Sequence, residues 1–485
     1  MDTEIKQNKE LQLWEALIPV MALIGMLAFN VFVFGDSALG GSNQFVLLLG
    51  GAVAAIIGFK NKISYKSMMD EVAENVKSTA GAIFILLMVG ALAGTWLISG
   101  VIPSMIYYGL QILSPAIFLP ATLIICSVIS IATGSSWTTS ATVGIALIGI
   151  GGALGFDKGM IAGAVISGAY FGDKLSPMSD TTNLAPAMAG TDLFTHIRYM
   201  TLTTIPTYII TFILFVILGL AFDAVGTVET ASLLADIKAS FNVSLWLFVV
   251  PIVVIGLIVK KTEPLIALLI GTLLGGAFAL VFQPNIVLML SGATEMNFTS
   301  AYKGIMNAIT TKSVIPTENA TLADLFTSGG MEKMLGTIWL ILCAMVFGGI
   351  MDAIGALSCI SQSLLKLAKS TFGLFASTVG SCLALNITAS DQYLAIVVPG
   401  KMFAQAYKDK GLAPENLSRT IEDSGTVTSV LIPWNTCGAY HAGTLGVGTF
   451  ELLPYAFFNL ISPIMTLIFA AFNIKIRQLT SNIEK

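Results

Sequence analysis

Charged residues are scarce in this sequence. Asp, Glu, Lys and Arg make up 11% of the 485 residues, whereas a soluble domain usually carries about 25%. Apolar residues reach 55%, so water is not the main solvent of this protein's surface. The net charge of -4 is small and spread among loops, which gives no indication of nucleic acid as a partner.

Cysteines and catalytic motifs are also lacking. The five cysteines are scattered singly, which fits neither a disulfide framework nor a metal-ligand or redox pair. The sequence contains no phosphate-binding loop, which argues against an ATP-driven pump. It contains neither a His-Glu-x-x-His nor a Gly-x-Ser-x-Gly motif, which argues against an intramembrane hydrolase. We therefore expect a transporter rather than an enzyme, with no cofactor beyond the transported ions.

Long apolar runs are what the sequence does have. A bilayer core of about 30 Å requires around 20 apolar residues in each helix. The run 14–34 is too long for a signal-peptide core and has no clear cleavage site, so we expect it to be retained as the first span. Clear spans are predicted at 16–34, 80–99, 200–222, 264–282, 335–351 and 455–472, with shorter ones at 45–59 and 245–259.

Two regions break this pattern. Between residues 117 and 171, and again between 372 and 433, short apolar runs are interrupted by Gly, Ser, Thr, Pro and Asp. Irregular backbone survives at membrane depth only inside protein or beside a water-filled cavity. These regions therefore predict discontinuous or re-entrant helices.

The lysines orient the chain. Positive residues collect in cytoplasmic loops, and the segments 223–242 (with Asp223) and 283–334 are poor in them. We therefore expect a multi-pass protein of a bacterial-type inner membrane, embedded in the lipid bilayer, with both termini cytoplasmic. The residues placed in the cytoplasm are Lys6, Lys9, Lys60, Lys62, Lys66, Lys77, Lys260, Lys261, Lys475, Arg477 and Lys485.

The sequence also predicts an internal repeat. Adding 255 to Gly94, Gly100, Thr133 and Ser135 gives Gly349, Gly355, Thr388 and Ser390. The lead-in to residue 80 is rich in lysine and the lead-in to residue 335 is external, so the two copies face opposite ways. Chance coincidence is the alternative, but inverted repeats with broken helices are common in secondary transporters.

We therefore expect an all-α polytopic membrane protein with two inverted-topology repeats and discontinuous or re-entrant helices. Residues 1–79 form the N-terminal spans of the first repeat, and residues 80–222 form its core. Residues 223–334 are linking spans and an external loop, and residues 335–485 form the core of the second repeat.

Four polar clusters carry the candidate chemistry, at 133–140, 172–183, 386–392 and 419–436. A hard cation such as Na+ prefers several oxygen ligands, which these clusters supply. Gly134, Pro177 and Pro433 would break helices and free backbone carbonyls. The predicted ion- or substrate-binding residues are Asp391, Asp180, Asp173, Asn183, Thr182, Thr133, Ser135, Ser136, Thr388, Ser390, Glu422, Asp423 and Asn435.

Asp391 and Asp180 are the predicted Na+ ligands, because an ionisable residue in a membrane interior is expensive to bury without a function. Asp391 has an alternative role as a helix N-cap, and Asp180 as a turn residue. For Glu422 and Asp423 the alternative is a surface ion pair with Arg419, three and four residues earlier. For the adjacent charges Asp173 and Lys174, the equally favoured alternative is that each pairs with other groups near a helix end.

The same clusters resemble the NhaC-type Na+/H+ antiporters of the ion transporter superfamily. The matching segments are long enough to be specific, and the similarity extends over most of the chain. The resemblance implies Na+/H+ exchange, although similar proteins exchange Na+ and lactate against malate and protons. The segments are TGSSWTTSATVG from Thr133, GAVISGAYFGDKLSPMSDTTNLAPAMAGTDLF from Gly163, SDQYLAIVVPGKMF from Ser390 and LSRTIEDSGTVTSVLIPWNTCGAYHAGTLGV from Leu417.

The mechanism we expect is competition: a buried carboxylate binds either Na+ or H+, and the carrier reorients only when loaded. The main alternative is a Na+-coupled organic acid exchanger of the malate/lactate type. Lys174, Arg419 and the helix starting near Ser136 are available to hold its carboxylate. A channel or a non-transporting scaffold would leave the broken helices and polar clusters unexplained. A small carboxylate substrate and a homodimer stay open.

Overall fold

The apolar runs fold into long helices, because a helix satisfies its own backbone hydrogen bonds where no water is present. The computed structural model describes residues 11–34, 40–221, 227–317 and 319–479. Lys6, Lys9, Asp223 and Lys485, which entered the orientation prediction, lie outside these residues. Within them, eight helices are long and apolar enough to cross a membrane. These are α1 (Leu13–Phe34), α2 (Ser42–Lys60), α4 (Ala80–Ile98), α6 (Pro115–Thr133), α11 (Leu193–Ala221), α14 (Pro264–Phe282), α18 (Gly330–Ala353) and α20 (Thr371–Thr388).

Two bent helix pairs raise this number to as many as ten in the described part of the chain. The segments Ala231–Ser240 and Leu245–Val259 meet at 83°, and Thr449–Tyr455 and Phe457–Ala471 meet at 57°. The predicted spans at 245–259 and 455–472 thus belong to bent pairs. The chain is a multi-pass membrane protein.

Shorter helices complete the chain. They include two π-helical turns, η2 and η4, which lie inside the regions that the sequence marks as irregular. In order, the elements are α3 (Tyr65–Ser78), α5 (Val101–Ile112), α7 (Ser136–Thr139), η2 (Ser140–Gly144), α8 (Ile145–Ala153), α9 (Lys158–Leu175), α10 (Asp180–Ala189), α12 (Thr227–Ser240), η3 (Leu245–Phe248), α13 (Val249–Val259), α15 (Pro284–Ser291), α16 (Phe298–Thr310), α17 (Ala320–Leu325), α19 (Ala356–Lys366), α21 (Gln392–Asp409), α22 (Pro414–Ile421), η4 (Glu422–Thr426), η5 (Ser429–Leu431), α23 (Thr436–Leu445), α24 (Thr449–Leu452), η6 (Leu453–Tyr455) and α25 (Phe457–Ala471).

One small sheet departs from the all-helical expectation. Strands β1 (Ser313–Val314) and β2 (Thr327–Ser328) pair antiparallel, with Ser313 opposite Ser328. They lie in the predicted external loop, on either side of α17. These two-residue strands only join two parts of the loop, and the membrane-spanning part stays helical.

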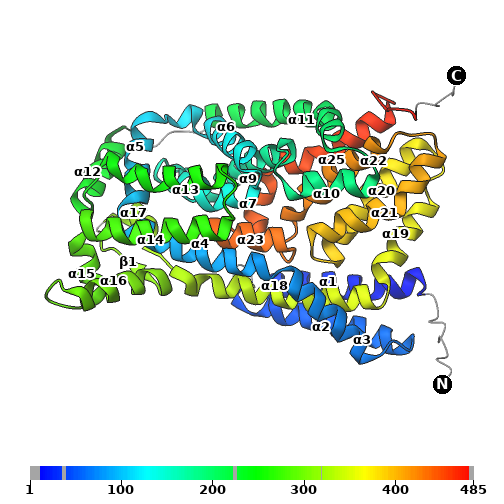
Figure 1. Cartoon of the computed structure of the whole chain (residues 1–485), viewed down its shortest axis with the longest axis horizontal. Helices are drawn as coiled ribbons and strands as arrows, with labels where there is room; N and C mark the ends of the chain where they lie inside the picture. Colours follow the sequence, from blue (N-terminus) through cyan, green and yellow to red (C-terminus); the bar gives the residue numbers. More distant parts are fainter. Residues whose placement is uncertain (1–10, 35–39, 222–226, 318, 480–485) are drawn as a thin grey trace.

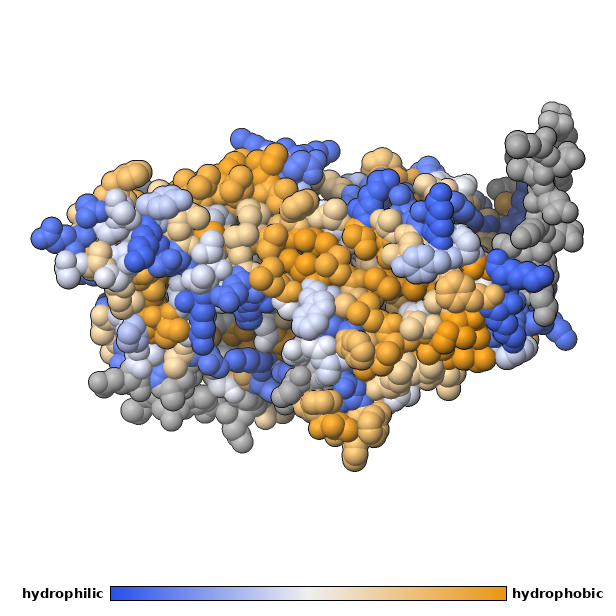
Figure 2. Space-filling view, turned by 90° about the horizontal axis from the view of Figure 1, so that it is seen from below, coloured by the Kyte–Doolittle hydropathy of each residue, from blue (hydrophilic) through white to orange (hydrophobic). Residues whose placement is uncertain are grey.

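Most of the long helices run along the longest axis of the molecule (Figure 1). Helices α12, α15, α16 and α17 gather at one end of this axis, and α3, α19 and α22 gather at the other. Apolar side chains cover much of the middle of the face seen in Figure 2, whereas hydrophilic ones gather toward its two ends. Large exposed apolar side chains such as Phe32 and Val281 fit contact with lipid rather than water.

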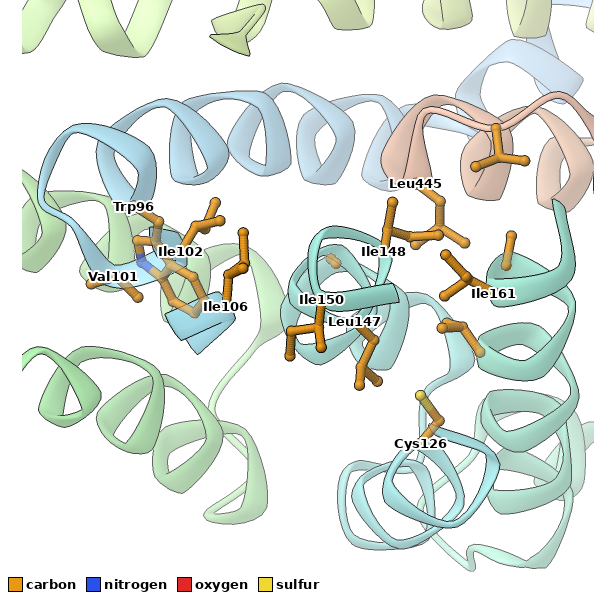
Figure 3. Close-up of a cluster of buried hydrophobic side chains, with 14 of the residues drawn as sticks. Trp96, Val101, Ile102, Ile106, Cys126, Leu147, Ile148, Ile150, Ile161 and Leu445 are labelled. Atoms are coloured by element: carbon orange, nitrogen blue, oxygen red, sulfur yellow. The ribbon is translucent and has the colours of Figure 1, made fainter. Parts of the chain in front are cut away.

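The interior is held by close packing, since lipid leaves little hydrophobic driving force between helices. The largest apolar cluster joins α4, α5, α6, α8, α9 and α23, and Figure 3 shows part of it. Helices α6 and α9 approach closely at Gly168 and Gly172, where an added Cβ would lie 2.4 Å from Leu123 O and 2.5 Å from Ser127 O. This contact fixes the end of α9, which carries Asp173 and Lys174.

Candidate ion-binding site

The helix interruptions surround a cavity of about 510 Å³, which we call cavity 1. Its wall comprises the start of α4, the α13–α14 turn, the interruption between α6 and α7, the end of α9, the start of α10 and the start of α21. Five of the predicted site residues line it, namely Thr133, Ser135, Ser136, Asp173 and Asp180. The structure therefore brings residues of the first two polar clusters together around one space.

Asp173 joins two of the interrupted helices. Its buried carboxylate accepts hydrogen bonds through Oδ2 from Ser136 N at 3.2 Å and from Ser136 Oγ at 2.7 Å. Ser136 opens α7, where backbone N–H groups are free and favour a negative charge. The contact pins the end of α9 against the start of α7 and orients the carboxylate at the cavity wall.

Lys174 and Asp423 form an ion pair in the interior, with both side chains fully buried. Thr203 Oγ1 donates to Asp423 Oδ2 at 2.7 Å, and Thr466 Oγ1 donates to the same oxygen. Ser462 Oγ lies 3.4 Å from Asp423 Oδ1 and 3.3 Å from Lys174 Nζ. A buried pair loses the hydration of both ions, so its stability depends on such additional hydrogen bonds.

Glu422 is the neighbour of Asp423, and it is only half satisfied. Thr181 Oγ1 donates to Glu422 Oε1 at 3.1 Å, while Oε2 has no donor among the described residues. Thr426 Oγ1, four residues further on, is buried and equally without a partner in that part of the chain. Both residues lie on the π-helical turn η4, a geometry that occurs frequently at functional sites. Glu422 thus presents a free carboxylate oxygen inside the protein.

Arg419 does not pair with either acid, so the surface ion pair considered from the sequence is wrong. Its side chain is fully buried, and Nε and both terminal nitrogens lack a hydrogen-bond partner among the residues described. The guanidinium lies 4.5 Å from the centre of the Tyr199 ring. It is held by stacking and by cation–π attraction, and Asp423 takes Lys174 as its cation instead.

Asp391 is the N-cap of α21. Its Oδ1 accepts hydrogen bonds from Tyr393 N at 2.8 Å and Leu394 N at 3.1 Å, and Ser390 before it has a left-handed φ of 60°. Asp180 is the first residue of α10, and its exposed side chain lines cavity 1. Na+ binding by either residue stays a prediction.

Several other predicted residues hold the interruptions in shape. Asn183 Nδ2 donates to Pro177 O at 3.0 Å and Ser179 O at 2.7 Å. Thr182 Oγ1 donates to the last carbonyls of α9, and Thr388 Oγ1 to Ala384 O in its own helix. Ser135 caps α7 by accepting from Thr138 N at 3.1 Å. The polar groups of these four residues bond the backbone, whereas Thr133 Oγ1 and Ser390 Oγ are buried without a partner among the described residues.

Hydrogen bonds also tie two interruptions together. Asn435 caps α23 and donates through Nδ2 to Asn386 O and Asn386 Oδ1, both at 3.1 Å. Trp434 Nε1 donates to Ile387 O at 2.8 Å, and Thr436 N donates to Ser390 O at 2.9 Å. The end of α20 is thereby joined to the start of α23.

Sequence reasoning missed the hydroxyl groups around Asp423. Thr203 lies on α11, and Ser462 and Thr466 lie on α25. All three are polar residues inside apolar spans, and Ser462 and Thr466 are four residues apart, so they lie on one helix face. This spacing of hydroxyls within a span was the available signal.

Comparison with known proteins identifies the family. Residues 168–474 match the model of the Na+/H+ antiporter family. The chain belongs to this family. It is 37% identical to the Na+/H+ antiporter NhaC of Alkalihalophilus pseudofirmus, over 86% of this chain and 87% of the relative. The resemblance inferred from the sequence is thus confirmed.

Two further relatives carry other names. The chain is 35% identical to the malate-2H+/Na+-lactate antiporter of Bacillus subtilis, over 92% of each chain. It is 33% identical to the arginine/ornithine antiporter ArcD of Halobacterium salinarum, over 94% of this chain and 90% of the relative. All of these names describe antiporters, and none indicates an enzyme.

Proposed function

We propose that this protein exchanges Na+ for H+ across the cytoplasmic membrane by alternating access, and that the two ions compete for Glu422. The observation that carries the proposal is the free Oε2 of a fully buried Glu422, one hydrogen bond from cavity 1 through Thr181. An ionisable group in a membrane interior is a functional candidate by default. The family membership and the NhaC relatives support the choice of ions.

Glu422 Oε2, Thr181 Oγ1 and Thr426 Oγ1 form the oxygen set that we assign to Na+. When a proton binds Glu422, the carboxylate loses its negative charge and Na+ leaves. When Na+ arrives through cavity 1, past Asp173 and Asp180, the proton leaves. Each loaded state has the same net charge at Glu422, so either one can cross the apolar interior.

Lys174 and Asp423 fix the position of Glu422 relative to α9. Their ion pair links α9 to η4, so a change at Glu422 is passed to the neighbouring interrupted helix. The lysine also adds a positive charge near Glu422, which lowers its affinity for Na+ and favours release. In this scheme Asp423 positions Glu422 and need not itself release a proton.

Two inverted repeats would supply the two access states. The offset of 255 that relates the polar clusters also relates the helices. It carries Pro115–Thr133 to 370–388, where α20 spans Thr371–Thr388, and Asp180–Ala189 to 435–444, where α23 spans Thr436–Leu445. The proposed cores are residues 80–222 and 335–485. Cavity 1 includes Lys261, so the lysine bias supports an opening toward the cytoplasm, with both termini on that side of a bacterial inner membrane.

Na+-coupled exchange of an organic acid is the second candidate. The observation that favours it is Arg419, a buried guanidinium without a carboxylate partner among the described residues. Guanidinium groups bind carboxylates with two parallel hydrogen bonds, and one relative is named a malate/lactate antiporter. Arg419 would then hold the substrate carboxylate.

Proteoliposomes that contain a pH-sensitive dye separate the two candidates. A Na+ gradient alone should drive proton movement in the wild type, and Glu422→Gln should stop it. Glu415→Gln is the matched control, because Glu415 lies on the preceding helix and pairs with Arg477 near the surface. Proton movement that requires added malate or lactate, and that disappears in Arg419→Lys, would establish the second candidate instead.

A further inference from the structure

A second cavity, which we call cavity 2, lies beyond cavity 1 along α4. Its volume is about 170 Å³, and its wall includes Val89 of α4, Ile148 of α8 and Leu445 of α23. Figure 3 shows Ile148 and Leu445 pointing toward one another. Lys158 and Asp324 also line it and form an ion pair of 3.2 Å with both side chains exposed. Cavity 2 therefore reaches solution on the side of the 283–334 loop.

The two cavities lie close together, because two stretches of chain line both of them. On α4, Ile85 lines cavity 1 and Val89 lines cavity 2. These residues are one helical turn apart, a rise of about 6 Å. Thr138 of α7 lines cavity 1 and Ile145 of α8 lines cavity 2, with the π-helical turn η2 between them. Only a thin layer of side chains separates the cavities.

Aromatic rings fill this layer. The ring of Trp137, which lines cavity 1, stacks on Tyr440 of α23 with centroids 4.0 Å apart and planes at 14°. Tyr440 also donates a hydrogen bond to Trp137 O at 3.1 Å. One turn further along α23, Thr444 lines cavity 2. His441 packs edge-on against Trp137, and we call Trp137, Tyr440 and His441 the aromatic layer.

The layer also buries polar groups that have no hydrogen-bond partner among the described residues. Neither ring nitrogen of His441, nor Ser140 Oγ at the start of η2, has a hydrogen-bond partner within the described ranges. Both residues are completely buried. Leaving polar groups dry and unpaired costs free energy. If water or a hydrated cation enters the layer, these groups gain hydrogen-bond partners and the free-energy cost of burying them unpaired disappears.

We propose that the aromatic layer is the gate between the two cavities, and that cavity 2 is the vestibule through which the cation reaches the opposite side. Once cavity 1 has closed toward its own side, parting of Trp137 from Tyr440 gives the cation access to cavity 2 and hydrates His441 and Ser140, so no continuous pore forms. The identity of the cation as Na+ rests on the proposed function. The position of the gate does not, because it follows from the two cavities and the rings between them.

Thiol labelling in oriented membrane vesicles tests the gate. Thr444→Cys is introduced into a chain whose five native cysteines are replaced by serine, and a charged, membrane-impermeant methanethiosulfonate is added from one side. We expect reaction only from the side of cavity 2. With Trp137→Ala added, reaction from the side of cavity 1 should appear, at a rate at least tenfold above the background seen with Trp137 present. Tyr440→Phe keeps the stacked ring and should leave the pattern unchanged.

Phe156→Ala is the matched control, since Phe156 stacks on Phe118 at 5.4 Å outside both cavity walls. Tyr440→Ala replaces Trp137→Ala if that variant does not fold. Reaction from both sides in the presence of Trp137 would overturn the gate, as would an unchanged pattern in a folded ring-deleted variant. No reaction from either side would overturn the vestibule. Because labelling measures access and not exchange, failure of Na+/H+ exchange in liposomes leaves these results interpretable.

Discussion

Asp391 and Asp423 are both buried acids beside helix interruptions, yet their charges are balanced in different ways. Asp391 is satisfied by two backbone N–H groups of the helix that it begins. Asp423 is satisfied by Lys174, 249 residues away in sequence, and by hydroxyls from α11 and α25. A locally balanced acid needs only its own helix, whereas one balanced across the molecule links helices that lie far apart in the sequence.

The largest effect on stability and exchange is expected when the Lys174–Asp423 ion pair is removed. Asp423→Asn leaves Lys174 buried without a counter-ion, which should lower the free energy of unfolding by about 3–5 kcal/mol and abolish exchange. Thermal unfolding in detergent and liposome transport measure the two effects. Asp324→Asn is the matched control, because it removes the acid from an exposed Lys–Asp pair and should cost less than about 1 kcal/mol. Equal losses in the two variants would contradict the distinction.

Glu422→Gln should have the second largest effect. It removes the ionisable group but keeps an oxygen for Thr181, so the unfolding free energy should change by less than about 1.5 kcal/mol. Na+-driven proton movement should nevertheless fall to the background of empty liposomes, because an amide cannot exchange a proton. A Gln variant that transports normally would remove Glu422 from the mechanism and return attention to Asp391 and Asp180.

The pH dependence of the apparent Na+ constant also tests whether Glu422 is the shared carboxylate. Protonation of Glu422 removes the Na+ ligand, so the apparent Na+ constant should rise as pH falls. In the limit of one proton displaced per Na+, the rise is about tenfold per pH unit, and it should level off at high pH, where no proton competes. Transport measured over a matrix of Na+ concentrations and pH values checks this. A constant that does not change with pH would disprove competition.

The smallest effect is expected at Asp391. Asn is about as good an N-cap as Asp, so Asp391→Asn should change the unfolding free energy by less than about 0.5 kcal/mol and keep the pH dependence of the wild type. Asp391→Ala should cost about 1 kcal/mol through the lost cap. Calorimetry and the liposome assay together measure this. A stable Asn variant without exchange would show that Asp391 is the shared carboxylate after all.

The sequence was sufficient for features that depend on local chain chemistry. Apolar runs predicted the spans, and Gly134, Pro177 and Pro433 marked places where helices do end. Residues of the first two polar clusters line cavity 1. These predictions succeed because membrane thickness and backbone hydrogen bonding act on each segment separately.

Tertiary contacts were beyond such reasoning. Arg419 lies four residues before Asp423, which by spacing favours a pair on one helix, yet Lys174 from α9 takes the carboxylate. The preference for Asp391 as a Na+ ligand rested on the same kind of local reasoning, and it stays a prediction. An isolated charge within an apolar run is conspicuous in sequence, while the cation and the three hydroxyls that surround Asp423 come from separate helices.

The hydrogen bonds from Trp434, Asn435 and Thr436 to Ile387, Asn386 and Ser390 have a mechanical consequence. Each helix interruption alone would be a hinge with its own freedom. Because the end of α20 is bonded to the start of α23 at several points, bending at one interruption would also displace the other. The α23 segment, with Tyr440 at its centre, is therefore a lever fixed to α20 rather than an independent flap.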